Sequence, residues 1–242
     1  MEHACGAGAV LTVRTVAETG STNADMLKLA RGGLGAGLWL CAERQVAGRG
    51  RQGRQWISSH GNLSASTLVR LRPCDPEAAT LALVAGVAVQ EVASTFLPDV
   101  LLKWPNDLLL GASKIAGILL ERSGDAVVVG VGMNLAHHPE LSDRPTTSLA
   151  AQGANLAPEV AADMLDEAFA RWLGRWRGEG ISPVRARWLE RAHPVGTALT
   201  ARLPDGDAID GLFDGLEADG ALTLRLAGGA RRVIHAGDVF LL

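Results

Sequence analysis

The chain has 242 residues, of which 48% are hydrophobic and 20% are charged, and its formal net charge is −3. These values are ordinary for a soluble globular protein of one or two domains, and the net charge gives no reason to expect a nucleic-acid or membrane partner. Cys5, Cys41 and Cys74 are widely spaced and lack zinc-ligand spacing, which favours reduced thiols in a cytoplasmic protein.

The first hundred residues predict alternating strands and helices. Strands are expected at 9–17, 37–43 and 62–71, and helices at 21–33 and 75–96. Ser21 or Thr22 can cap the first helix. Asp75-Pro76 predicts the start of the second, because Asp is a good N-cap and Pro fits the first helical position.

The rest of the chain divides into two parts with different sequence patterns. Strands are expected at 100–104, 107–110, 114–121 and 126–135, followed by a loop at 136–157 and helices at 158–177 and 182–192. After Pro194 the pattern contains only short strands broken by turns, which predicts a small β-barrel. We therefore expect an α+β domain, a mixed sheet backed by helices, over residues 1–192 and a β-domain over residues 193–242.

One segment is strongly basic although the whole chain is slightly acidic. No acidic residue occurs between Arg44 and Cys74, while six arginines do. The centre of this segment, QVAGRGRQGRQW at 45–56, also carries three glycines. Glycines allow backbone N–H groups to turn toward an anion, and arginines add fixed charge, so the segment predicts an anion-binding loop that can move. A solvated surface loop is the alternative.

A second cluster of polar residues follows a predicted strand. The stretch KWPNDLLL at 103–110 offers Asn106 and Asp107, and Lys114 opens the next strand. If the two strands pair as a hairpin, Asp107 and Lys114 lie at the same end of it. A lysine among apolar neighbours needs an anionic partner, such as a phosphate or a carboxylate. An ordinary turn and an exposed lysine are the alternatives.

Two shorter motifs are ambiguous on their own. Gly130 and Gly132 lie within a predicted strand, which favours close approach by a ligand or by another backbone, and Asn134 follows them. Ser21-Thr22-Asn23 places two hydroxyls and an amide at a helix start, where simple capping would also explain them. It is the combination and order of the motifs that is informative.

Taken together, these motifs resemble those of the biotin protein ligases. The resemblance is carried by Ser21-Thr22-Asn23, by QVAGRGRQGRQW at 45–56, KWPNDLLL at 103–110, KIAGILLE at 114–121 and GVGMNL at 130–135, and in the C-terminal part by GLFDGLEADGALTLRL at 211–226 and GDVFLL at 237–242. It implies a class II synthetase-like or biotin–lipoate ligase-like sheet followed by an SH3-like barrel. Only about twenty residues precede Ser21, so it further implies a ligase without the DNA-binding domain of the family's repressors.

The resemblance also implies an activity. Such enzymes join biotin to AMP with ATP and Mg²⁺, release pyrophosphate, and transfer biotin to a lysine of a biotin carboxyl carrier domain. No direct protein ligand for Mg²⁺ is implied, no nucleic-acid or membrane partner is expected, and pairing into a homodimer stays open.

The resemblance assigns roles to individual residues. Arg51, Lys114 and Asp107 would be catalytic, with Asp107 acting in the transfer step. Biotin would be bound by Ser21, Thr22, Asn23, Gln45, Gly48, Arg49, Arg51, Lys114, Gly117 and Leu119. The nucleotide would be bound by Arg49, Arg51, Trp56, Asn106, Lys114 and Asn134.

Two other readings remain at this point. A lipoate or octanoyl ligase would share the scaffold and the adenylate chemistry, although its loop pattern differs. A non-enzymatic module that binds an anion or RNA through the basic segment would leave Lys114, Asn106 and Asp107 without a reason.

Overall fold

The larger part of the protein is built on a seven-stranded mixed sheet. A computed structural model describes residues 12–142 and 144–242. The sheet order is β1-β2-β3-β7-β6-β5-β4, in which β1 and β2 are parallel and the other pairs antiparallel. Its strands are β1 (Thr12–Thr19), β2 (Leu38–Gln45), β3 (Leu63–Arg70), β4 (Val100–Lys103), β5 (Asp107–Leu110), β6 (Ser113–Ser123) and β7 (Ala126–Met133). The mixed sheet expected from the sequence is confirmed; Cys5 and the start of the first predicted strand lie outside the described residues.

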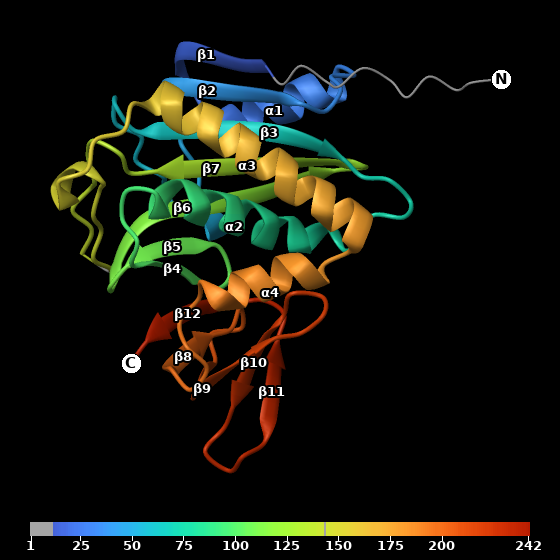
Figure 1. Cartoon of the computed structure of the whole chain (residues 1–242), viewed down its shortest axis with the longest axis vertical. Helices are drawn as coiled ribbons and strands as arrows, with labels where there is room; N and C mark the ends of the chain where they lie inside the picture. The colour runs from blue at the N-terminus through green and yellow to red at the C-terminus, as the bar shows by residue number, and fades with distance from the viewer. Residues whose placement is uncertain (1–11, 143) are drawn as a thin grey trace.

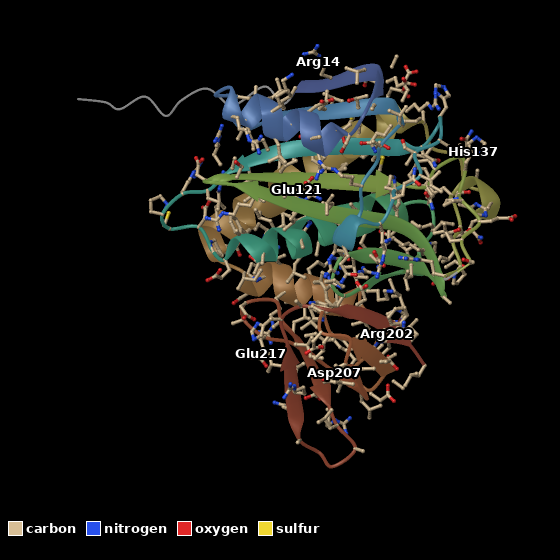
Figure 2. All side chains as sticks on the ribbon, turned by 180° about the vertical axis from the view of Figure 1, so that it is seen from behind. Arg14, Glu121, His137, Arg202, Asp207 and Glu217 are labelled. Atoms are coloured by element: carbon tan, nitrogen blue, oxygen red, sulfur yellow. The ribbon has the colours of Figure 1, made fainter. Side chains whose placement is uncertain are left out.

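Helices cover the two faces of this sheet unequally. Helices α2 (Leu81–Ser94) and α3 (Pro158–Glu179) cross one face, and α1 (Thr22–Arg31) lies on the other (Figures 1 and 2). Short 3₁₀ turns occur at Arg51–Gly53, Ala78–Thr80 and Ala150–Gln152. None of the helices in the described parts of the chain has the length and apolarity to cross a membrane.

The main core lies between the sheet and the α2/α3 face. Trp39 of β2 packs edge-on against Phe169 of α3 with ring centroids 5.6 Å apart. The indole of Trp176 is fully buried and donates a hydrogen bond of 2.8 Å to Thr80 Oγ1, which satisfies its N–H. The sheet face beneath α2 and α3 is therefore taken up mainly by the hydrophobic core.

The start of α2 differs from the sequence-based prediction. Asp75-Pro76 does not begin the helix, which starts at Leu81 after a 3₁₀ turn. The carboxylate of Asp75 is used elsewhere: it accepts a hydrogen bond of 3.0 Å from Arg72 N and pairs with the guanidinium of Arg177 on α3 at 3.4 Å. The carboxylate that the sequence pattern assigned to a helix cap is therefore paired with Arg177 on α3 instead.

A second, smaller sheet follows α4 (Ser182–Glu190). Its five antiparallel strands, in the order β11-β10-β9-β8-β12, are β8 (Ala198–Arg202), β9 (Ala208–Leu216), β10 (Leu222–Arg225), β11 (Arg231–Ile234) and β12 (Asp238–Leu241). This agrees with the expected small β-domain. The division expected at residues 192/193 falls between α4 and β8 and stays a prediction.

The two sheets are packed together through aromatic side chains. Trp188 of α4 contacts Phe213 of β9 with centroids 6.5 Å apart, and α4 lies between the two sheets (Figure 1). Trp104 Nε1, at the end of β4, donates a hydrogen bond of 3.0 Å to Gly220 O of the smaller sheet. Lys103 Nζ at the end of β4 also donates a hydrogen bond of 3.0 Å to Val239 O, which places β12 beside the segment from which the sequence predicted polar site residues.

Candidate active site

A cavity of about 530 Å³ lies on the α1 face of the larger sheet and extends to the smaller sheet. Its described lining carries seven cationic side chains but only two carboxylates, Asp107 and Asp238. The cations are Arg49, Arg51, Arg54, Lys103, Lys114, Arg144 and Arg202. This excess of positive charge, in a chain of net charge −3, suits an anionic ligand.

One end of the cavity is a buried polar network at the start of α1. Ser21 is the N-cap residue, but its hydroxyl makes no capping hydrogen bond among the described residues. The Thr22 backbone N and hydroxyl both donate to Gln45 Oε1, at 2.8 and 3.1 Å. Asn23 receives a hydrogen bond from Ser66 Oγ at 2.6 Å and donates to Glu121 Oε2 at 2.9 Å. Simple capping therefore does not explain these residues, which form a fixed set of donors and acceptors at the cavity.

Glycines of β6 and β7 make close approach possible on the cavity floor. A Cβ added at Gly132 would lie 2.3 Å from the Trp56 indole, and one at Gly130 would lie 2.1 Å from Asn23 Oδ1. At Gly117 the nearest atom is the Nζ of Lys114, at 3.0 Å. The close approach to β7 comes from the side chains of Trp56 and Asn23, not from another backbone, and approach by a ligand stays a prediction.

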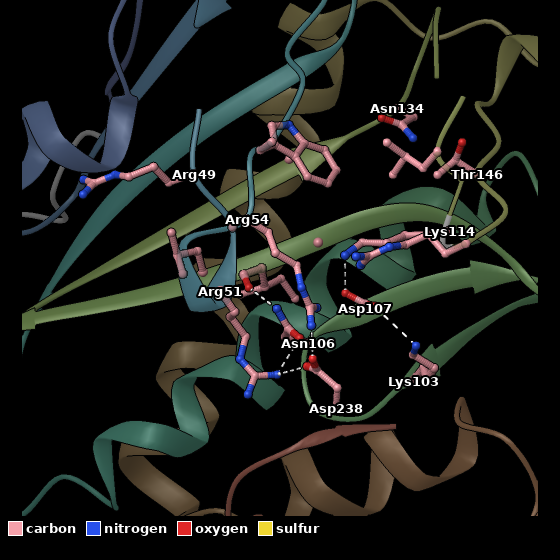
Figure 3. A pocket seen from close by; sticks show the side chains of 18 of the residues that line it. Arg49, Arg51, Arg54, Lys103, Asn106, Asp107, Lys114, Asn134, Thr146 and Asp238 are labelled. Carbon is pink, nitrogen blue, oxygen red and sulfur yellow. Dashed lines mark hydrogen bonds and ion pairs between the residues drawn. The ribbon is translucent and has the colours of Figure 1, made fainter. Parts of the chain in front are cut away.

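The hairpin of β5 and β6 brings Lys114 and Asp107 together. Lys114 Nζ lies 2.5 Å from Asp107 Oδ1, and Lys103 Nζ lies 3.5 Å from the other carboxylate oxygen (Figure 3). The predicted hairpin is confirmed, but the register is not the one expected: Asp107 pairs with Gly117 and Lys114 with Leu109, across a bulge. The backbone positions are thus at different ends of the ladder, and the length of the lysine side chain closes the gap.

The pKa values of Asp107 and Lys103 are both lowered, but for different reasons. Burial alone would raise the pKa of the Asp107 carboxyl, but the neighbouring ammonium groups of Lys114 and Lys103 outweigh burial, so its pKa lies below the ordinary value. Burial lowers the pKa of Lys103, partly offset by the Asp107 charge. Asp107 is therefore an ionised counter-ion at neutral pH and a weak proton acceptor.

The Gly/Arg loop, residues 45–56, covers the cavity. Arg49 pairs with Glu121 at 3.4 Å, and Arg51 Nη1 donates to Asn106 Oδ1 at 3.3 Å. Gly48 does not line the cavity: a Cβ there would lie 2.4 Å from the Trp56 carbonyl oxygen, so this glycine lets the two ends of the loop pack together. The Trp56 indole is 5.7 Å from Lys114 Nζ, which is cation–π range.

Asn134 follows β7 at the far side of the cavity. Its Nδ2 donates to Thr147 O at 3.0 Å, while its Oδ1 is buried without a hydrogen-bond partner among the described residues. A buried acceptor without a partner is costly, so a ligand donor would stabilise it. The backbone of the same region holds Lys114 in place, because Lys114 N donates to Pro145 O at 3.0 Å.

The structure brings most of the predicted site residues to one cavity. Those that line it are Ser21, Thr22, Asn23, Gln45, Arg49, Arg51, Trp56, Asn106, Asp107, Lys114, Gly117, Leu119 and Asn134. Sequence reasoning did not assign Arg54 or Lys103, although both lie inside quoted motifs. It also assigned no role to Arg202, Asp238 or Phe240 of the smaller sheet, although Asp238 and Phe240 lie in the GDVFLL segment at 237–242.

The geometry can bind and activate an anion at a defined point. The ammonium of Lys114, on β6, and the guanidinium of Arg51, in the Gly/Arg loop, both line the cavity. Together they could neutralise two negatively charged reactants bound there. Among the described residues, no group of three or more His, Cys, Asp or Glu side chains is placed to hold a metal ion.

The chain matches two protein families in succession. Residues 18–134 match the Biotin/lipoate A/B protein ligase family, and residues 196–242 match the Biotin protein ligase C terminal domain. The biotin–[acetyl-CoA-carboxylase] ligase of Paracoccus denitrificans is 40% identical over 93% of this chain and 98% of its own length. The enzyme of that name from Mycobacterium tuberculosis is 37% identical, over 93% of this chain and 86% of its own length.

A solved structure shares the fold. The biotin protein ligase from Aquifex aeolicus in complex with biotin and ATP superposes with a TM-score of 0.83, covering 95% of this chain and 99% of that chain at 23% identity. With a full-length relative at 40% identity and both family matches in the expected order, this chain belongs to the biotin protein ligase family.

Proposed function

We propose that this protein is a biotin–[acetyl-CoA-carboxylase] ligase that makes biotinyl-5′-AMP from biotin and ATP and transfers biotin to a lysine of a carboxyl carrier domain. The names of the relatives support the activity. The observation that carries it is the cationic cavity, in which Lys114, Asp107 and the Gly/Arg loop converge beside the Thr22–Gln45 network.

In the first step a biotin carboxylate oxygen attacks the α-phosphorus of ATP, and pyrophosphate leaves. Both reactants are anions, so the barrier falls when cations neutralise them and the charge that builds on the phosphate. We assign this role to Lys114 and Arg51, with Arg49 closing the loop. Lys114 would then exchange Asp107 for the ligand, a change that costs little because Lys103 remains within 3.5 Å of that carboxylate.

Biotin would lie between α1 and the glycine-lined strands. The ureido ring has one carbonyl acceptor and two N–H donors, and Ser21, Thr22 and Gln45 offer complementary hydrogen-bonding groups. Leu119 and Gly117 would contact the bicyclic ring through the backbone. The space over Gly130 and Gly132 of β7 is already filled by Asn23 and Trp56, so the ring would lie against these side chains rather than on the strand itself.

The adenosine would lie toward Asn134 and Trp56. The free Oδ1 of Asn134 can accept a hydrogen bond from a base amino group, and the indole provides an aromatic surface for stacking. Mg²⁺ has no fitting set of protein ligands among the described residues, and both lining carboxylates already pair with cations. We therefore expect the ion to arrive on the phosphates of ATP.

In the second step the carrier lysine attacks the acyl carbon, AMP leaves, and a proton passes from the amine to solvent. A lysine amine with a pKa of about 10.4 is protonated at neutral pH and must lose that proton first. With its lowered pKa, Asp107 is suited to attract and orient the incoming ammonium group rather than to act as a strong base.

A direct assay tests this function. Protein, biotin, Mg-ATP and a carboxyl carrier domain are mixed, and the carrier is examined for the mass increment of one biotin. Replacing biotin with lipoate separates the two ligase classes that share this fold. Pyrophosphate release that does not depend on biotin, or a carrier that gains lipoate instead, would contradict the assignment.

A further inference from the structure

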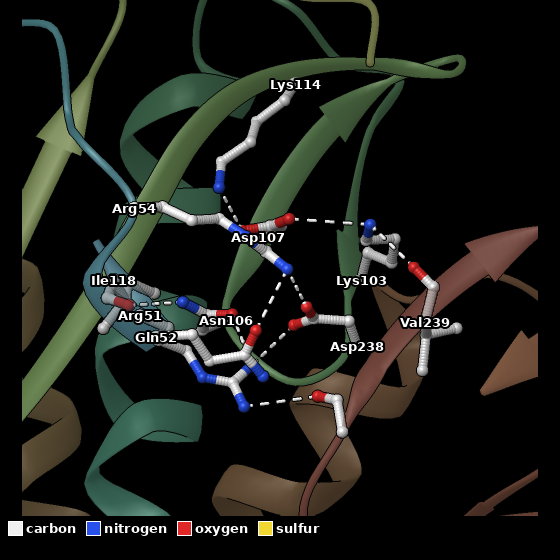
Figure 4. A network of polar contacts seen from close by, with 11 residues as sticks. Arg51, Gln52, Arg54, Lys103, Asn106, Asp107, Lys114, Ile118, Asp238 and Val239 are labelled. Carbon is white, nitrogen blue, oxygen red and sulfur yellow. Dashed lines mark hydrogen bonds and ion pairs between the residues drawn. The ribbon is translucent and has the colours of Figure 1, made fainter. Parts of the chain in front are cut away.

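The tip of the Gly/Arg loop is bound to the smaller sheet. Arg54 pairs with Asp238, the first residue of β12, through a short contact to Oδ2. Arg51 Nη1 lies 3.4 Å from the other oxygen of the same carboxylate, and its Nη2 donates to Gly237 O at 3.2 Å (Figure 4). One carboxylate of the C-terminal sheet therefore faces two arginines of the catalytic loop.

Asp238 is well placed to fix the loop because its own position is fixed. Strand β12 pairs along its whole length with β8, and Lys103 Nζ on the catalytic sheet donates to Val239 O at 3.0 Å. A Cβ at Gly237 would lie 2.7 Å from Arg202 O, so a glycine allows the start of β12 to pack tightly on the end of β8. The Asp238 side chain is 16% exposed, which makes its charge more effective than that of a surface carboxylate.

The two arginines use Asp238 differently. Arg54 has a close charged contact with it, and its further contact, to Gln52 Oε1 at 3.1 Å, lies within the loop. Arg51 meets Asp238 at the longer distance of 3.4 Å and shares its guanidinium with Asn106 and Gly237. Arg54 is thus the anchor, while Arg51 is held near the cavity by several weaker contacts from which an anionic ligand can draw it.

We propose that Arg54 and Asp238 form a latch between the Gly/Arg loop and β12, and that Asp238 is a positioning residue that keeps Arg51 over the reacting phosphate. The proposal rests on the proposed function, because it takes the phosphate to be that of biotinyl-AMP. In this proposal the smaller sheet has a defined part in the reaction. It holds the Gly/Arg loop over the cavity and so slows the escape and hydrolysis of the adenylate.

The latch predicts an effect on retention of the intermediate rather than on recognition of biotin. The Thr22–Gln45 network does not involve β12, so the KM for biotin should stay near that of the wild type in Asp238→Asn. Loss of a charged hydrogen-bonded partner should speed release of bound biotinyl-AMP about 10-fold. Arg54→Ala should act in the same direction.

The experiment forms biotinyl-AMP on the enzyme from biotin and labelled Mg-ATP, removes free nucleotide, and follows release of label with time. The variants are Asp238→Asn, Arg54→Ala and the double variant, and a shared latch requires the double variant to release the adenylate no faster than Asp238→Asn alone. Asp210→Asn is the matched control, because Asp210 is an exposed carboxylate of the same sheet that is hydrogen-bonded to Thr200.

The outcomes separate the two proposals. Faster release in Asp238→Asn and Arg54→Ala, without additivity and with Asp210→Asn unchanged, supports the latch. Wild-type release rates in both single variants, or additive effects in the double variant, overturn it. A fall in melting temperature alone, with unchanged release, marks the pair as merely structural. A wild-type protein that makes no biotinyl-AMP would instead refute the proposed function.

Discussion

The ammonium of Lys114 lies 2.5 Å from the carboxylate of Asp107, although the two residues lie on different strands and are not paired in the ladder. Lys103 lies on the other side of the same carboxylate, at 3.5 Å. The three side chains are only 11–18% exposed, so their charges depend strongly on each other. The carboxylate of Asp107 thus positions the ammonium groups of Lys103 and Lys114 where the negative charge of the ligand would lie.

Replacement of Lys114 by alanine should abolish useful adenylation while the fold is kept. Removal of one well-placed electrostatic donor typically costs a factor of about 10²–10³ in rate. Lys103 remains to pair Asp107, so the carboxylate is not left alone. Biotin-dependent pyrophosphate release measures the effect, and Lys28→Ala on the exposed side of α1 is the control. Near-normal adenylation in Lys114→Ala would remove this residue from the mechanism.

Replacement of Asp107 by asparagine should harm transfer more than adenylation. The amide cannot attract the incoming ammonium group, and misplacement of the nucleophile can cost about 100-fold. The two half-reactions are measured separately, as pyrophosphate release and as transfer from preformed biotinyl-AMP to the carrier. Equal losses in both would contradict the role assigned to Asp107.

The same substitution should reveal the pH dependence of stability. Although burial opposes it, the two lysines keep the folded-state pKa of Asp107 below the ordinary value of 3.8. A lowered carboxyl pKa contributes stability that is fully present above the unfolded-state pKa and is lost as the pH falls through the folded-state pKa. The difference in melting temperature between wild type and Asp107→Asn should therefore be constant near neutral pH and shrink below about pH 4. A difference that grows toward acid would have the wrong sign.

Gly132→Ala should displace Trp56. The new Cβ would lie 2.3 Å from the indole, which is far inside van der Waals contact, so the ring must leave its place on β7. We expect weaker binding of ATP and slower adenylation, measured by steady-state kinetics. Gly174→Ala is the control, since a Cβ there meets nothing within 4 Å on α3. Unchanged kinetics in Gly132→Ala would mean that the position of Trp56 does not matter.

Periodicity and turn chemistry predicted most of the fold because they act locally. Strand pairs such as β5 and β6, and the long amphipathic α3, follow from spacing within one segment. The start of α2 could not be predicted in this way. Asp75 has the local chemistry of a helix cap, but its partner Arg177 lies 102 positions away in the sequence.

The site was predictable to the extent that its chemistry lies in contiguous motifs. Lys114, Asp107 and Arg51 come from such motifs, and the structure brings them to one cavity. The distance between Lys114 and Asp107 depends on a bulge that periodicity does not reveal. Asp238 lies in the GDVFLL segment, but that segment does not reveal its contact, because its partner Arg54 in the Gly/Arg loop is 184 positions away in the sequence.

Residues of both sheets line the cavity, and this has a consequence for engineering. Because β12 supplies the carboxylate that faces Arg51 and Arg54, the C-terminal sheet is not an interchangeable module. A chimaera that grafts the corresponding sheet from another ligase would retain biotinyl-AMP as this enzyme does only if the graft also brings an acid to this position. Homologues should accordingly show correlated substitution between loop arginines and this strand, so that recombination breakpoints within the gene would be tolerated poorly.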